Sequence, residues 1–193
     1  GGFAPRVESH AQALELIHQA IVSAGYEPGK QVYIGLDVAA DSFYDANEDQ
    51  YLLKPEGAKL SRESLINVYR EWIEKYAVVS IEDGLHEEDW DGWALMKEKL
   101  EKEPASWGKT LMLIGDDLLV TNVERLKKAI EKNSCNSVLI KVNQIGTVSE
   151  TLDCMRLARD NNMNRIISHR SGETTDDFIA DLAVGAQAEF IKS

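Results

Sequence analysis

The chain has 193 residues, of which 44% are apolar and 28% charged, and its formal net charge is −12. A chain of this length and composition fits one globular domain, covering residues 1–193, with a sizeable core. The negative charge argues against a nucleic-acid surface and against a polybasic membrane patch, because both need clustered lysine and arginine. No apolar run approaches the roughly 20 residues of a membrane-spanning helix, and no signal peptide is recognisable.

The sequence contains two cysteines, Cys135 and Cys154. Their spacing matches neither a metal-binding motif nor a disulfide framework. We therefore expect two reduced structural thiols and a cytoplasmic protein.

The predicted elements begin with a helix over residues 8–24, which Gly25 ends, and a strand over 32–37. A loop with a small hairpin follows over 41–54, with its turn at 47–49. From there strands and helices alternate. The further predicted strands cover 78–82, 111–115, 137–141, 165–168 and 189–192. The further predicted helices cover 61–75, 89–102, 122–132, 149–161 and 174–186, with Ser61 and Thr121 as candidate N-caps and a connecting loop over 104–109.

Alternation of this kind predicts an α/β fold with a parallel sheet, either doubly wound or closed as a TIM-like (β/α)8 barrel. We favour the barrel, because reactive residues follow every predicted strand rather than one switch point of the strand order. A barrel usually needs about 250 residues. We therefore expect about six of the eight strands here, in a piece of a longer chain.

Polar and charged residues occupy all six predicted strand ends. These residues are Asp37, Glu82–Asp83, Asp116–Asp117, Lys141, His169–Arg170–Ser171 and Lys192. Three carboxylates from three neighbouring strands form a hard oxygen-ligand set that suits Mg²⁺. Since side chains alternate along a strand, only one acid of each adjacent pair should face the barrel mouth. Spacing alone does not identify which one.

The remaining strand-end residues predict acid–base chemistry on a phosphorylated substrate. A divalent cation disfavours the protonated form of a nearby lysine, so that its amine can act as a base near neutral pH. Arg170 beside Ser171 suits a phosphate group. Together these groups favour removal of a proton alpha to a carboxylate, with Mg²⁺ holding the resulting charge.

Each feature also has an ordinary explanation. A single acid at a strand end is commonly a solvated residue or a helix cap. Lys141 alone could extend from an apolar strand into water, and His169–Arg170–Ser171 could be a simple loop. One active site explains all six strand ends together, whereas the ordinary explanations must account for each separately.

Several motifs make the sequence resemble the enolase family over essentially its whole length. They are Gly1–Pro5, Ile34–Asp37, Ser80–Gly84, Gly115–Leu118, Leu139–Thr147 and Ser168–Thr174. The last two motifs are long and specific. The resemblance implies a Mg²⁺-dependent lyase of glycolysis and gluconeogenesis that interconverts 2-phosphoglycerate and phosphoenolpyruvate.

The resemblance also assigns individual residues. It implies that Asp37, Glu82 and Asp116 hold the metal, that Lys141 is the base, and that Lys192 neutralises the substrate carboxylate. His169 would lie near the departing hydroxyl, and Arg170 and Ser171 would bind the phosphate. A lysine base used together with Mg²⁺ is a known pattern of this superfamily. The mechanism inferred above from the strand-end residues therefore does not count as separate support for the resemblance.

The resemblance further implies a homodimer or a higher assembly, with a second Mg²⁺ bound along with substrate. The family's general acid and its small N-terminal capping domain precede Gly1, so we expect negligible turnover from the 193-residue chain alone. Two alternatives stay open. One is an enolase-like surface-binding protein of the plasminogen-receptor type, with a secondary cell-surface location, or a structural protein. The other is a Mg²⁺-dependent superfamily member acting on a different acid.

Overall fold

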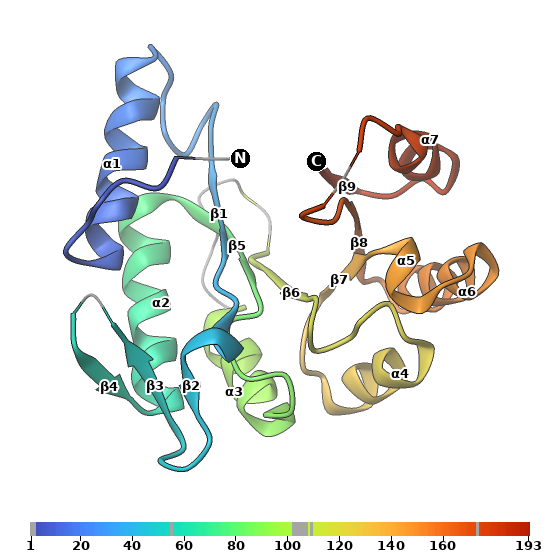
Figure 1. The fold of residues 1–193 in the computed structure, drawn as a ribbon, viewed down its shortest axis with the longest axis horizontal. Helices are drawn as coiled ribbons and strands as arrows, with labels where there is room; N and C mark the ends of the chain where they lie inside the picture. The colour runs from blue at the N-terminus through green and yellow to red at the C-terminus, as the bar shows by residue number, and fades with distance from the viewer. Residues whose placement is uncertain (1–2, 55, 102–107, 109, 173) are drawn as a thin grey trace.

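A computed structural model describes residues 3–54, 56–101, 108, 110–172 and 174–193 of the chain. Its main feature is a six-stranded parallel sheet with the strand order β1-β5-β6-β7-β8-β9. The sheet curls into an incomplete barrel (Figure 1). Its strands are β1 (Ile34–Asp37), β5 (Val78–Glu82), β6 (Met112–Gly115), β7 (Ser137–Ile140), β8 (Asn164–Ser168) and β9 (Phe190–Lys192). The strand order confirms the predicted parallel architecture and its expected six strands.

Helices alternate with the strands of the main sheet, and the longer ones lie around the outside of the curl (Figure 1). The helices are α1 (His10–Ser23), α2 (Arg62–Tyr76), α3 (Trp90–Leu100), α4 (Val123–Lys132), α5 (Val142–Ile145), α6 (Val148–Asp160) and α7 (Phe178–Gly185). Consecutive helices from α1 to α4 contact one another, and α4 contacts α6. No helix among the described residues is long and apolar enough to cross a membrane.

A small antiparallel sheet lies between β1 and α2 in the chain. A short 3-10 helix, η1 (Ala40–Phe43), leads into β2 (Tyr44–Asp45), β3 (Gln50–Leu53) and β4 (Ala58–Leu60). The predicted hairpin is confirmed by the pairing of β2 with β3. The third strand, β4, was not predicted, because it has only three residues and pairs on one side only.

Side chains of the main sheet alternate between two apolar environments. Leu113 and Val138 belong to the main core, which the outer helices cover. Met112 and Leu139, their direct neighbours in sequence, belong to a second cluster inside the curl. This alternation decides which strand-end residues reach the interior of the barrel.

Most predicted boundaries agree with the structure within two residues, which is the normal uncertainty of helix and strand ends. Two differences are larger. Helix α7 begins at Phe178 rather than at residue 174, and the short helix α5 directly after β7 was not predicted. The loop predicted over 104–109 lies, except for residue 108, outside the described residues. Cys135 and Cys154 are free and buried, as expected of structural thiols.

Candidate active site

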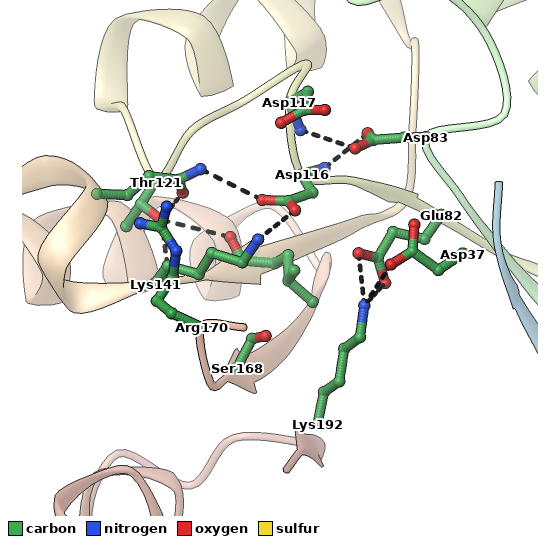
Figure 2. A network of polar contacts seen from close by, with 12 residues as sticks. Asp37, Glu82, Asp83, Asp116, Asp117, Thr121, Lys141, Ser168, Arg170 and Lys192 are labelled. Carbon is green, nitrogen blue, oxygen red and sulfur yellow. Dashed lines mark hydrogen bonds and ion pairs between the residues drawn. The ribbon is translucent and has the colours of Figure 1, made fainter. Parts of the chain in front are cut away.

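The strand ends place their functional side chains at one end of the curled sheet (Figure 2). In β5, Ser80 and Glu82 share the inner face, and Glu82 lines a cavity of about 270 Å³ with Asp37 and Lys192. Glu82 is therefore the inward-facing acid of the Glu82–Asp83 pair. β1 packs closely against β5 beside this cavity, since a Cβ atom on Gly35 would lie 2.7 Å from Oγ of Ser80.

Lys192 forms the first polar cluster with two carboxylates. Its ammonium nitrogen lies 2.8 Å from Oδ2 of Asp37 and 2.8 and 2.9 Å from the two carboxylate oxygens of Glu82. Burial opposes the charge on Lys192, but the hydrogen bonds to Asp37 and Glu82 outweigh it and raise the Lys192 pKa. Burial also raises the pKa of Glu82, although Lys192 acts in the opposite direction. From the sequence we expect a bound divalent cation to lower the pKa of the site lysines. Without the cation, the neighbouring carboxylates raise the pKa of Lys192 instead.

Lys141 forms the second cluster with Asp116, the inward-facing acid after β6. The Lys141 ammonium pairs with Oδ2 of Asp116, and both side chains are largely buried. The other carboxylate oxygen of Asp116 accepts a hydrogen bond from the side-chain amide of Gln144, at 3.4 Å. Gln144 belongs to α5, which begins directly after Lys141. Together the two clusters contain five predicted site residues, which come from the ends of five different strands and lie at the same end of the curled sheet (Figure 2).

Asp83 holds the backbone that carries Asp116. Its two carboxylate oxygens accept hydrogen bonds from the backbone N–H groups of Asp116 and Asp117, each at 2.9 Å. Burial raises the pKa of Asp83 to about 7, against the lowering effect of these two bonds. Among the described residues, Asp83, Asp116 and Asp117 are the acids whose oxygen atoms lie within 4.8 Å of one another, and the predicted ligand set of Asp37, Glu82 and Asp116 is not that closely spaced. Both oxygens of Asp83 are already used by the backbone, so this residue fits a structural role better than ligation.

The loop after β8 carries His169, Arg170 and Ser171. The backbone N–H of His169 donates to the carbonyl of Lys192 at 3.0 Å, which joins this loop to β9. Arg170 is exposed and donates to Oδ1 of Asn143 at 3.1 Å. Within the described part of the chain, the hydrogen bonds of the two lysine clusters do not extend to the side chains of His169 and Ser171. His169, Arg170 and Ser171, which directly follow β8, are called the rim residues below.

Sequence reasoning missed three residues of this network, Asp83 as a backbone acceptor, Gln144 and Thr121. The prediction that Thr121 caps the following helix is wrong, because the side chain of Asn122 accepts from the backbone N–H groups of Glu124 and Arg125. The Thr121 hydroxyl instead contacts Lys141 and Gln144. A signal for Gln144 was present, since the turn containing it directly follows the strand that ends at Lys141.

A curled parallel sheet with carboxylates and lysines at its strand ends defines the class of α/β-barrel domains, which place their functional groups at this face. Residues 1–193 match the family described as "Enolase, C-terminal TIM barrel domain". The chain belongs to the enolase family. A curated relative named enolase, from Natranaerobius thermophilus, is 49% identical over 193 residues, which are all of this chain and 43% of the relative. The chain thus spans less than half the length of that relative.

Proposed function

We propose that the protein containing this chain is a Mg²⁺-dependent lyase that interconverts 2-phosphoglycerate and phosphoenolpyruvate. The observation that carries this proposal is that Lys192 pairs with Asp37 and Glu82, and Lys141 pairs with Asp116, at the same end of the curled sheet (Figure 2). Membership in the enolase family supports the same reaction. The alternatives of a surface-binding or structural role need none of these five side chains.

Asp37, Glu82 and Asp116 would hold the metal ion. Their donor atoms are carboxylate oxygens, which are the ligands that Mg²⁺ prefers. Two of these carboxylates already converge on one positive charge, the ammonium of Lys192, so their orientation suits a cation. When bound, Mg²⁺ would supply positive charge that stabilises negative charge developing on the substrate carboxylate.

Lys141 would remove the proton from the carbon next to the substrate carboxylate. Its side chain is 15% exposed and starts from the end of a buried strand, so that the amine is fixed and shielded from water. Lys192, from the edge strand β9, would neutralise the carboxylate as its charge increases. Neither lysine alone supplies both functions.

The rim residues Arg170 and Ser171 would bind the phosphate, through a guanidinium fork and a hydroxyl donor. His169 would lie near the hydroxyl that leaves. The exposure of Arg170 and Ser171 supports a role in binding a ligand that enters from solvent. We also propose a homo-oligomer and a cytoplasmic location, and the two free buried thiols support a reducing compartment.

The test is the Mg²⁺-dependent formation of phosphoenolpyruvate, followed by its ultraviolet absorbance, in the full-length protein. Lys141→Ala should lower kcat by about 10²–10⁴-fold, as expected when a general base is removed. Lys127→Ala is the matched control, because Lys127 is exposed on α4 and pairs only with Glu124 among the described residues. Non-phosphorylated glycerate should not be a substrate if the rim residues recognise phosphate.

Lack of turnover by the unmodified full-length protein with Mg²⁺ bound would refute the proposed reaction. Equal turnover of glycerate and 2-phosphoglycerate would point instead to a superfamily member that acts on another acid. Full activity of Lys141→Ala would agree with the proposed reaction but would show that Lys141 is not its base.

A further inference from the structure

Thr121 occupies an unusual backbone position directly beside the proposed base. It lies in the connection between β6 and α4, with φ of 56°, and its neighbour Val120 has φ of 44°. Left-handed backbone angles are strongly disfavoured for β-branched residues, so two in succession require compensation from their surroundings. Thr121 is also completely buried, which makes the partners of its hydroxyl group decisive.

The Thr121 hydroxyl completes the hydrogen bonding of Lys141. It accepts the backbone N–H of Lys141 at 2.9 Å. β6 pairs with β7 only as far as Gly115 and Val138, so the sheet ladder on that side stops short of Lys141. The hydroxyl thus stands where a neighbouring strand would supply a carbonyl. It fixes the backbone at the point where β7 changes into α5.

The same hydroxyl is connected to the other end of the lysine side chain. It donates to Oε1 of Gln144 at 3.1 Å, and Nε2 of Gln144 donates to Asp116. Asp116 pairs with the ammonium of Lys141. The contacts therefore form a closed ring from the Lys141 backbone, through Thr121, Gln144 and Asp116, to the Lys141 ammonium.

We infer that Thr121 is a positioning residue that sets the location of the Lys141 amine through this ring. The inference rests on the proposed function, in which Lys141 is the base. A purely local role as a helix cap does not account for Thr121, because Asn122 already caps α4. The strained backbone is consistent with a hydroxyl whose position matters more than local conformational preference.

The experiment compares four variants of the full-length protein. Thr121→Val keeps the shape and removes the hydroxyl, whereas Thr121→Ser keeps the hydroxyl. Thr121→Ala also removes the hydroxyl and reduces crowding at the left-handed backbone, so it carries the comparison if the valine variant does not fold. Thr151→Val is the matched control, because Thr151 is equally buried and its hydroxyl donates to the carbonyl of Thr147, the N-cap residue of α6, rather than to a residue of the lysine clusters.

Thr121→Val should lower kcat for 2-phosphoglycerate about 10- to 100-fold, since a small displacement of a catalytic group has effects of this size. KM should change less than about twofold, because the substrate contacts remain. Thr121→Ser should restore kcat to within about threefold of the unmodified protein. Hydrogen exchange followed by mass spectrometry should show faster exchange of the 139–144 peptide in Thr121→Val and unchanged exchange of that peptide in Thr151→Val.

Three results would overturn the inference. They are a kcat of Thr121→Val within twofold of the unmodified protein, an equal loss of kcat in Thr151→Val, and a Thr121→Ser variant as impaired as Thr121→Val. In each case the unmodified protein is active and the proposed function stands. An inactive unmodified protein would instead refute the proposed function itself, and the inference would fall with it.

Discussion

The ammonium nitrogen of Lys192 lies 2.8 Å from Oδ2 of Asp37, although 155 positions separate the two residues in the sequence. They stand at the ends of β9 and β1, which are the opposite edges of the six-stranded sheet. In a flat sheet, edges separated by four strands would lie more than about 20 Å apart, at roughly 4.8 Å per strand spacing. The contact therefore shows that the sheet is curled, and the curl brings Lys192 of β9 to Asp37 of β1.

Removing the Lys192 charge should increase affinity for Mg²⁺ while abolishing turnover. Lys192→Met frees the carboxylates of Asp37 and Glu82 from competition with the ammonium. We expect an affinity gain of about tenfold, near the low end of the ~1–4 kcal/mol that unit charges at such distances contribute. Isothermal titration calorimetry with MgCl₂ measures the affinity, and the phosphoenolpyruvate assay measures turnover. Weaker Mg²⁺ binding in Lys192→Met would contradict the placement of the metal between these carboxylates.

Asp83→Asn should reduce both Mg²⁺ affinity and stability. One carboxylate oxygen becomes an amide NH₂ that faces a backbone N–H of Asp116 or Asp117, so a hydrogen bond is lost and two donors meet. We expect a loss of about 1–3 kcal/mol in the free energy of unfolding. Urea denaturation and calorimetry check the two effects. Asp91→Asn, at the exposed start of α3, is the control, and unchanged Mg²⁺ affinity in Asp83→Asn would show that Asp116 does not depend on Asp83.

The ion pair between Arg165 and Glu189 should make stability depend on pH. Burial opposes ionisation of Glu189, but hydrogen bonds from the Arg165 guanidinium and backbone lower its pKa overall. A carboxylate with a lowered pKa adds stability above its unfolded value, and this stability disappears as pH falls through the folded pKa. Glu189→Gln should therefore cost about 1–2 kcal/mol at about pH 7, given the partial exposure of Glu189.

Urea denaturation of the unmodified and Glu189→Gln proteins at about pH 7 and about pH 3.5 provides the measurement. The difference in unfolding free energy between the two should shrink at the lower pH. A difference that is constant across this range would mean that the Glu189 charge contributes nothing to folding.

The two thiols should be unreactive in the folded protein. Burial raises the pKa values of Cys135 and Cys154 to about 12. At about pH 8 only ~10⁻⁴ of each would be thiolate, and the thiolate is the form that reacts. Iodoacetamide treatment followed by peptide mass spectrometry should therefore label neither residue before denaturation and both after it. Rapid labelling of native Cys154 would indicate local opening of α6.

The order of strands and helices was predictable because apolar runs with turn residues between them alternate along the whole chain. The choice between Glu82 and Asp83, or between Asp116 and Asp117, did not follow from spacing and was implied by the family resemblance alone. Every residue of β5 is buried, so its apolar pattern has no period of two from which to read the inner face. In the structure, the position of Glu82 in the cavity with Asp37 and Lys192 shows which side of β5 faces inward.

The hydrogen-bond network around Lys141 could not be predicted from the sequence for a different reason. A threonine before a helix resembles an N-cap in sequence, and the competing cap, Asn122, is its direct neighbour. Two left-handed residues, Val120 and Thr121, turn the chain so that the Thr121 hydroxyl points to β7. Neither residue type predicts such a backbone, because both disfavour it.

The long sequence separation within the Lys192 cluster has a consequence for synthesis of the protein. Glu82 and Asp37 leave the ribosome 110 and 155 residues before the lysine that pairs with them. At about 5–20 residues per second, the Glu82 carboxylate waits roughly 6–22 s for its partner. During this interval β5 can pair with β1 while its acidic end stays charged and hydrated. The strand ends that carry Asp37 and Glu82 therefore stay exposed to water until β9, the last described strand, has been synthesised.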